Sequence, residues 1–208
     1  MTGQRGPEIA VQPPDAPHRN TLKQVRRVPL GMQHVKVPQD RIGVVIGEGG
    51  ETMREIESRA EVRLDIDSES GSVAIESVGD PVTALVAPDI VRAIGRGFDP
   101  ETALSLLDDD LRRFELIDLA DETRNDNDLR RQKGRLIGED GRTRELMEEL
   151  SGADVVIYGS TLGTIGGPEE VEAVRRATGM ILDGAPHGAV YSFLEEKHQE
   201  LTRGPDLA

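Results

Sequence analysis

The spacing of apolar residues switches between strand-like and helix-like periods along the chain, and the same series of periods occurs twice. Alternating apolar and polar residues predict strands, whereas apolar residues three and four apart predict helices. Asp80 and Pro81 suit the N-cap and the first turn of a helix. From residue 33 the pattern predicts a strand at 35–37, a helical turn at 42–46, a helix at 53–60, a hairpin at 62–66 and 73–75, and a helix at 81–94. The first half is therefore predicted to have the order β-α-α-β-β-α.

The same order of elements returns in the second half of the chain. The predicted elements there are a strand at 114–119, helices at 129–137 and 146–150, a hairpin at 155–158 and 161–165, and a helix at 168–182. The tract Ile-Gly-Glu-x-Gly-x-Thr begins at Ile46 and again at Ile137, 91 residues later. Because one tract recurs inside one order of elements, the sequence indicates an internal duplication.

Each half carries a Gly-x-x-Gly tract between its first two helices, at residues 47–50 (loop 1) and 138–141 (loop 2). Glycine has no Cβ and adopts positive φ readily, so the backbone can approach a ligand closely. Each loop leads into a helix N-terminus, where unpaired N–H groups favour anions. One such tract is a weak signal, because it also occurs in turns without a ligand. Two copies in the same context predict KH domains, which clamp the RNA backbone with this loop.

We therefore expect an α+β protein with two tandem KH domains, each a three-stranded sheet packed on three helices. The residues before Met32 are rich in proline and show no apolar period, so they are predicted to be disordered. An alternative is that translation starts at Met32. The expected organisation is a disordered tail at 1–31, KH domain 1 at 32–98, a linker helix at 99–113, KH domain 2 at 114–185, and a C-terminal helix and tail at 186–208.

The net charge of −14 argues against nucleic-acid binding, because phosphate attraction is typical of basic surfaces. Local charge differs between the copies: residues 40–57 hold two basic and five acidic residues, whereas residues 128–145 hold six basic and four acidic ones. We therefore expect loop 2 to be the main RNA contact, and loop 1 to bind RNA weakly or to hold protein. Only four basic residues are lysine, which is typical of a halophilic protein. In molar salt the Debye length is about 3 Å, so the net charge would matter little. An acidic interaction protein from an ordinary cytoplasm is the alternative.

The candidate RNA contacts are the two loops, the residues beside them and the nearby basic side chains. Carboxylates inside both loops would repel phosphate, which puts the loop affinity in question. Apolar groove walls are expected from Ile42, Val45, Ile46 and Leu64, and from Leu136, Ile137, Val155 and Ile157. The candidates are Ile46, Gly47, Glu48, Gly49, Gly50, Thr52 and Arg54 in the first copy, and Arg130, Lys133, Arg135, Ile137, Gly138, Glu139, Asp140, Gly141, Arg142, Thr143 and Arg144 in the second.

No metal site, cofactor or catalytic residue is predicted. The chain has no cysteine, and its four histidines are scattered. A nuclease using two metal ions is one alternative, with ligands drawn from Asp108, Asp109, Asp110, Asp118 and Asp121. Three adjacent aspartates point in different directions, however, and an acidic surface contains such runs. No stretch of 18 apolar residues is present. We expect a cytoplasmic monomer that is not an enzyme.

Five tracts resemble the archaeal members of the partner-of-Nob-one (Pno/Dim) family. They are residues 35–47, 64–71, 92–98, 133–138 and 184–191. The resemblance implies two type I KH domains packed as one unit and bound near the 3′ end of small-subunit ribosomal RNA. It also implies a role in small-subunit maturation beside a Nob-type endonuclease, and a link with the alpha subunit of translation initiation factor two. A protein-interaction adaptor with little RNA binding is the alternative function.

Overall fold

The computed structural model describes residues 32–203 of the chain. The tail predicted at 1–31 and the last five residues, 204–208, lie outside the described residues. The predicted disorder of the first segment and the alternative start at Met32 therefore stay predictions.

The first unit contains a three-stranded antiparallel sheet with strand order β1-β3-β2. Val73 in the central strand pairs with Val35 of β1 and with Ile66 of β2. The elements are β1 (Met32–Lys36), α1 (Gln39–Ile46), the short 3-10 helix η1 (Glu48–Gly50), α2 (Glu51–Arg59), β2 (Val62–Asp67), β3 (Ser72–Ser77), α3 (Pro81–Ala84) and α4 (Ala87–Gly95). The helices cover one face of the sheet and enclose an aliphatic core.

The second unit repeats this sheet with strand order β4-β6-β5, and Gly163 in the centre pairs with Leu116 and Val156. α5 (Pro100–Leu104) and η2 (Ser105–Leu107) connect the units. The elements that follow are β4 (Arg113–Asp118), α6 (Asp126–Ile137), η3 (Glu139–Gly141), α7 (Arg142–Ser151), β5 (Asp154–Tyr158), β6 (Thr161–Gly166), α8 (Pro168–Leu182) and α9 (His187–Arg203). The predicted fold class, two α+β domains that each contain a three-stranded sheet packed on helices, is confirmed.

The single helix predicted at 81–94 is wrong. α3 ends at Ala84, and α4 begins at Ala87. Pro88 in the first turn of α4 has no N–H group, so it cannot continue a helical hydrogen-bond ladder from the preceding turn. The break leaves Val82 and Leu85, which lie within the predicted helix, largely exposed.

In each domain one arginine, called the clamp, donates hydrogen bonds to two backbone carbonyls at or just beyond the end of α4 or α8. In the first domain, Arg41 donates from Nε to the Ile94 carbonyl at 2.9 Å and from Nη2 to the Phe98 carbonyl at 2.7 Å. In the second, Arg135 donates to the Ile181 and Ala185 carbonyls. A cation suits this place because the last carbonyls of a helix lack backbone donors and carry partial negative charge.

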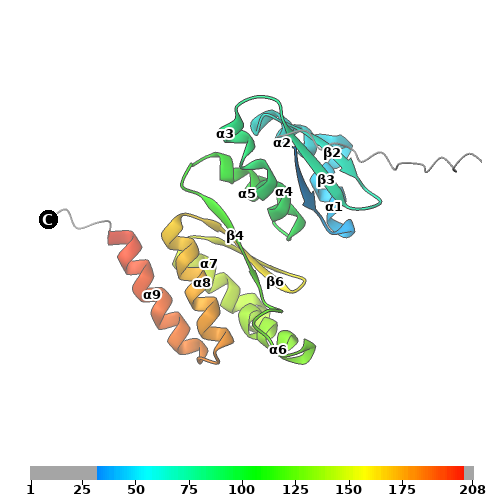
Figure 1. Cartoon of the computed structure of the whole chain (residues 1–208). Coiled ribbons are helices and arrows are strands. Elements are labelled where there is room, and N and C mark those ends of the chain that lie inside the picture. Colours follow the sequence, from blue (N-terminus) through cyan, green and yellow to red (C-terminus); the bar gives the residue numbers. More distant parts are fainter. Residues whose placement is uncertain (1–31, 204–208) are drawn as a thin grey trace, which may run out of the picture.

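The first domain packs against the sheet of the second domain (Figure 1). The central strand of that sheet, β6, is buried at every position. α6 to α8 cover one face of that sheet, and residues at the end of α4 cover the other. Phe98 packs edge-on against Phe114, with ring centroids 6.1 Å apart. Ile165 of β6 therefore belongs to the apolar core of the first domain. A Cβ atom at Gly163 would lie 2.9 Å from the Phe98 ring, so only glycine permits this approach.

A polar contact continues the interface between the domains at the end of β5. The Tyr158 hydroxyl donates to the carboxylate of Asp40, the second residue of α1. This hydrogen bond raises the pKa of Tyr158 above its usual value, and partial burial acts in the same direction. Arg112 pairs with Asp154 across 2.9 Å and joins the linker to the start of β5. One end of β5 is therefore tied to the first domain, and the other end is tied to the linker.

Gly163→Val is expected to destabilise the protein by about 1–3 kcal/mol, because its branched side chain would overlap the Phe98 ring. The free energy of urea unfolding measures the loss. In a Phe98→Ala background the same substitution should cost less, because the added methyl groups would fill vacated space. Equal costs in both backgrounds would contradict this account of the interface.

Candidate nucleic-acid interface

The first glycine of each loop is required by a close contact with a threonine five residues later. Gly47 has φ +75° and Gly138 has φ +78°, a region that other residues rarely adopt. A Cβ atom would lie 2.4 Å from the Thr52 hydroxyl oxygen in loop 1 and 2.3 Å from the Thr143 hydroxyl oxygen in loop 2. The recurring tract Ile-Gly-Glu-x-Gly-x-Thr therefore encodes one backbone shape twice.

The third loop residue also has positive φ in both copies, although its identity differs. Gly49 has φ +57° and Asp140 has φ +50°. Aspartate tolerates this left-handed conformation better than most residues, so both loops keep the same shape. The difference is chemical: loop 2 exposes the carboxylates of Glu139 and Asp140, whereas loop 1 exposes that of Glu48.

The helices that follow the loops begin without a side-chain cap. Gly50 and Gly141 occupy the N-cap positions of α2 and α7, and neither offers a side-chain acceptor to the first N–H groups. Asp80, Asp99 and Asn125 each accept a hydrogen bond from the first turn of α3, α5 or α6, whereas α1, α4 and α8 also begin without a side-chain cap. The two loops thus open onto helix N-termini whose N–H groups can bind an oxygen of a ligand.

Two arginines of the second copy are exposed on the helices that flank loop 2. The Arg142 side chain, first in α7, is 61% exposed, and its Nη1 lies 3.8 Å from a Glu145 carboxylate oxygen. Arg130 is exposed on α6 and has no ion pair within residues 32–203. The neighbouring Arg131 is bound instead to Asp128 at 2.7 Å, a hydrogen bond that lowers the pKa of that carboxyl group.

Three other basic candidates of the second copy bind groups of the protein itself. Arg135 is the clamp at the end of α8, so the structure places its guanidinium inside the domain rather than at the loop. Lys133 donates to the Gly159 carbonyl in the β5–β6 turn. Arg144 bonds Glu148 at 2.7 Å and is directed toward β5. The count of basic residues in this copy therefore overstates the charge available to phosphate, because it treats every cation as free.

In the first copy the only basic candidate, Arg54, folds back onto its own loop. Its Nη2 donates to the Gly49 carbonyl at 2.9 Å and its Nε to the Gly50 carbonyl at 3.1 Å. The guanidinium therefore braces loop 1, and Glu48 and Glu51 dominate the exposed charge beside it. The two copies share a backbone shape but differ in local electrostatics.

The predicted groove walls are mostly core residues. Of the eight, only Ile46, Ile137 and Ile157 reach the surface, and Ile137 is 37% exposed. Periodicity identified the apolar face but could not tell a groove from the core beneath it. α1 and α6 instead expose bare backbone at Gly43 and Gly134, where an added Cβ would meet no described atom within 4 Å. The buried residues are Ile42, Val45, Leu64, Leu136 and Val155.

A hollow of about 660 Å³ beside loop 2 is lined by α9 as well as by the loop. Tyr191 shares a hydrogen bond of 2.9 Å with the Thr143 hydroxyl, and its ring lies 5.9 Å from that of His187. His187 also bonds the Arg135 carbonyl at 2.9 Å. The sequence pattern does not place either side chain at loop 2, because only tertiary packing brings the C-terminal helix there.

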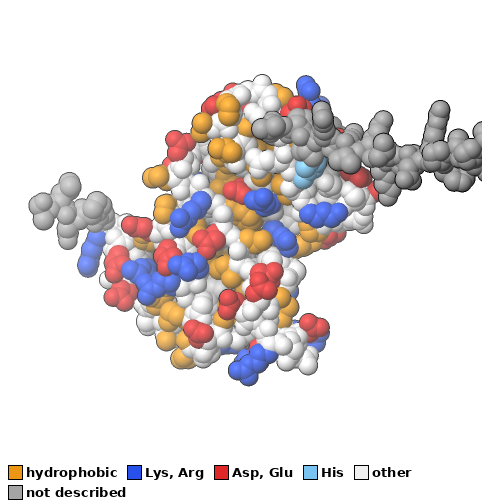
Figure 2. Space-filling view, in the orientation of Figure 1, with side chains coloured by type: hydrophobic (Ala, Val, Ile, Leu, Met, Phe, Trp, Pro, Cys, Tyr) orange, Lys and Arg blue, Asp and Glu red, His pale blue; other side chains and the backbone are white. Residues whose placement is uncertain are grey.

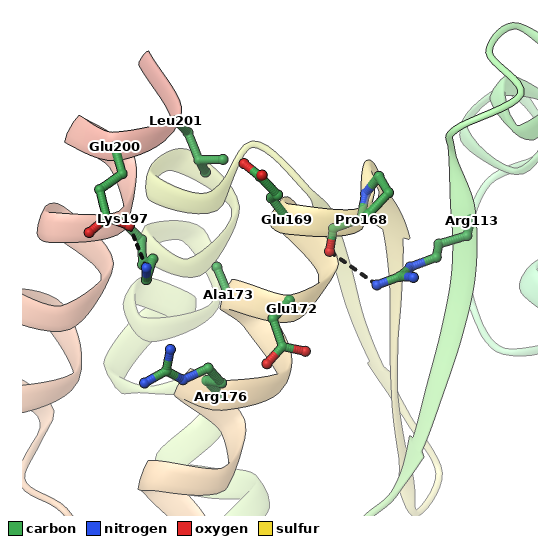
Figure 3. Close-up of a pocket in the computed structure, with 9 residues that line it drawn as sticks. All are labelled: Arg113, Pro168, Glu169, Glu172, Ala173, Arg176, Lys197, Glu200 and Leu201. Carbon is green, nitrogen blue, oxygen red and sulfur yellow. Dashed lines mark hydrogen bonds and ion pairs between the residues drawn. The ribbon is translucent and has the colours of Figure 1, made fainter. Parts of the chain in front are cut away.

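A larger hollow of about 730 Å³ lies between α8, α9 and the start of β4 (Figure 3). Arg113 bonds the Pro168 carbonyl there, and Lys197 pairs with Glu200. Its three basic side chains face three acidic ones, so the hollow offers an anion little net attraction. On the face shown in Figure 2, basic and acidic side chains are similarly mixed.

The aspartates considered as metal ligands do not form a cluster. Asp108 pairs with Arg59 at 2.6 Å, Asp109 accepts a hydrogen bond from the Leu111 N–H, and Asp118 from the Ala120 N–H. Within residues 32–203 no three histidine, cysteine or acidic side chains are placed to hold a metal ion. In the same range no helix is long and apolar enough to cross a bilayer.

Comparisons with known proteins identify both halves of the chain. Residues 32–89 match the sequence model of the KH domain, and residues 113–199 match that of the eukaryotic type KH-domain (KH-domain type I). A KH domain-containing protein of Methanocaldococcus jannaschii is 44% identical over 81% of this chain and 75% of its own length. The pre-rRNA-processing protein pno1 of Emericella nidulans is 33% identical over 66% of this chain, which spans 55% of that protein.

A solved structure agrees with these relatives. It is the complex of a/eIF2alpha, aDim2p and rRNA from Pyrococcus horikoshii OT3. The matching chain is 44% identical, with a TM-score of 0.76, and the match covers 81% of this chain and 94% of that one.

Gly138→Ala is expected to destabilise the protein more than Gly141→Ala. Both positions have φ near +80°, so both substitutions strain the backbone. Only at Gly138 does the new methyl group collide with Thr143, because the nearest atom to a Cβ at Gly141 lies 3.9 Å away. The free energies of urea unfolding should differ by roughly 1 kcal/mol or more. Equal losses would show that the contact with Thr143 does not require glycine.

Proposed function

Because the chain belongs to the KH-domain family that includes the Pno1 and Dim2 proteins, we propose that it binds single-stranded ribosomal RNA of the small subunit near its 3′ end during ribosome maturation. The observation that carries the proposal is loop 2, a positive-φ turn that opens onto the uncapped N-terminus of α7, with an exposed arginine on each of the two flanking helices. The relatives support it: one is a pre-rRNA-processing protein, and another is crystallised in a complex with rRNA.

In the proposed binding mode, the sugar–phosphate backbone lies across loop 2. The N–H groups at the start of α7 donate to a phosphate oxygen, and the helix dipole adds attraction. Arg142 supplies a charge-assisted hydrogen bond from the α7 side, and Arg130 does so from α6. The exposed backbone at Gly134 and the side chain of Ile137 then form the surface on which a base can lie.

The first domain is proposed to bind RNA more weakly, or to hold a protein partner. Its loop has the same shape, but Arg54 is used internally and the neighbouring side chains are acidic. Hydrophobic side chains gather over α3 of this domain (Figure 2), where Val78, Val82 and Leu85 are more than half exposed. Contiguous exposed apolar residues are typical of protein interaction sites. The alpha subunit of translation initiation factor two, which is present in the crystallised rRNA complex of the relative, is the proposed partner.

We propose that the protein acts without catalysis of its own, as a monomer in the cytoplasm, and that a Nob-type endonuclease beside it cleaves the RNA. The side chains of its acidic runs hold backbone N–H groups and arginines rather than facing one another. The net charge of −14 and the scarcity of lysine support a halophilic archaeal source. In concentrated salt, direct hydrogen bonds at the loop outweigh the distant field of the acidic surface.

Arg142→Glu is expected to weaken binding of a single-stranded oligonucleotide from the 3′ end of small-subunit ribosomal RNA by about tenfold or more. The loss corresponds to one charge-assisted hydrogen bond, and fluorescence anisotropy measures it. Arg175→Glu on α8 makes the same charge change away from loop 2 and should have little effect. Equal losses in both variants would indicate a general charge effect and would remove loop 2 from the proposal.

Glu139→Lys is expected to tighten RNA binding by roughly two- to tenfold at low salt, because a carboxylate that repels phosphate is replaced by a cation. The gain should shrink toward molar salt as screening increases. Glu169→Lys at the start of α8 is the control, with the same change of charge in the same domain. If Glu139→Lys weakened binding, the loop carboxylate would be a ligand group rather than a source of repulsion.

A further inference from the structure

On the edge strand of each sheet, one outward-facing backbone N–H group donates a hydrogen bond to a glutamate on the neighbouring helix. Glu57 on α2 accepts from the Leu64 N–H at 2.8 Å, and Glu148 on α7 accepts from the Val155 N–H at 3.0 Å. These glutamates are 91 residues apart, as are the strand residues they contact. An edge strand normally presents such groups to any ligand that pairs with it.

The two copies differ in the side chain available to the backbone carbonyl of the same strand residue. In the second, Arg144 Nη1 lies 2.7 Å from a Glu148 carboxylate oxygen and 3.5 Å from the Val155 carbonyl oxygen. The position equivalent to Arg144 in the first copy is Met53, which has no donor for the Leu64 carbonyl. A guanidinium therefore lies at the edge of β5 in the second domain. The first domain has a methionine at the equivalent position and no hydrogen-bond donor there.

Arg144 is held in place and is still accessible. Its side chain is 35% exposed and that of Glu148 is 31% exposed, so both border the space between α7 and β5. Nη1 is used by Glu148 and Val155, while Nε and Nη2 have no hydrogen-bond partner within residues 32–203. Arginine presents its N–H groups in a rigid planar fork, and the bond to Glu148 fixes the plane of that fork.

We propose that Arg144 reads a guanine base in the second domain, and that Glu148 positions it. This rests on the proposed RNA binding at loop 2: a base attached to the nucleotide held there reaches the edge of β5 and meets the free side of the guanidinium. The two acceptors of guanine, O6 and N7, match two parallel N–H donors, whereas adenine places an amino donor in the same region. The first domain, with Met53 and a free carbonyl, lacks this preference.

The test uses oligouridines of about ten nucleotides that carry a single central guanosine, adenosine or cytidine. Fluorescence anisotropy measures the dissociation constant of each. The full chain should bind the guanosine oligonucleotide at least about fivefold more tightly than the adenosine one. Arg144→Met, which copies the first domain, should abolish that ratio while leaving the affinity for the adenosine oligonucleotide nearly unchanged. Arg144→Lys keeps the charge but loses the fork, so it should abolish the ratio as well.

Arg142→Glu is the matched control, because loss of a phosphate contact should weaken all three oligonucleotides by the same factor and keep the ratio. Urea unfolding of the Arg144 variants should match that of the unaltered chain, since the ion pair is partly exposed. A wild-type chain without a guanosine preference, or an Arg144→Met chain that loses affinity equally for every base, would overturn the assignment. Failure of the wild-type chain to bind any of the oligonucleotides would instead overturn the proposed RNA binding itself.

Discussion

The close approach of Phe98 to Gly163 is the contact on which the arrangement of the two domains depends. It brings the end of α4 onto the sheet of the second domain and buries β6 on both faces. A strand buried on both faces cannot slide without opening voids or exposing apolar surface, so the pairing of the domains is rigid. The bond between Tyr158 and Asp40 then ties the start of α1, the helix that leads to loop 1, to the end of β5. The two loops are thus parts of one body.

The duplicated halves have kept their geometry and diverged in chemistry. The contacts that shape each loop, and the glutamate that covers the edge strand, occur at equivalent positions in both copies. Other positions at the loop and near the edge strand differ: Gly49 corresponds to Asp140, and Met53 corresponds to Arg144. Arg54 braces its own loop, whereas the equivalent position in the second copy is Glu145. The copies therefore present different side chains on one shared fold.

The element order, the loops and the duplication could be predicted from sequence because each depends on local periodicity or on glycine at a required φ. The break before Pro88 was missed, because the apolar spacing continues through it. The bonds that Arg135 and Arg144 make within the protein were missed for another reason. Counting charge in a window treats each cation as solvated, yet whether an arginine is free depends on carbonyls and carboxylates distant in sequence. The part of α9 beside loop 2, including Tyr191, likewise enters the site only through tertiary packing.

An acidic chain can bind RNA if the interaction is carried by groups within contact distance. Coulomb attraction between exposed charges falls off over about 8 Å at physiological ionic strength and over about 3 Å in molar salt. Backbone N–H groups at a helix N-terminus keep their donors whatever the net charge, and they contact phosphate directly. Loop 2 concentrates such donors and adds Arg142, while its carboxylates reduce long-range attraction to polyanions in general. On this view, affinity comes from fit at the loop, and the acidic surface disfavours RNA that touches the protein anywhere else.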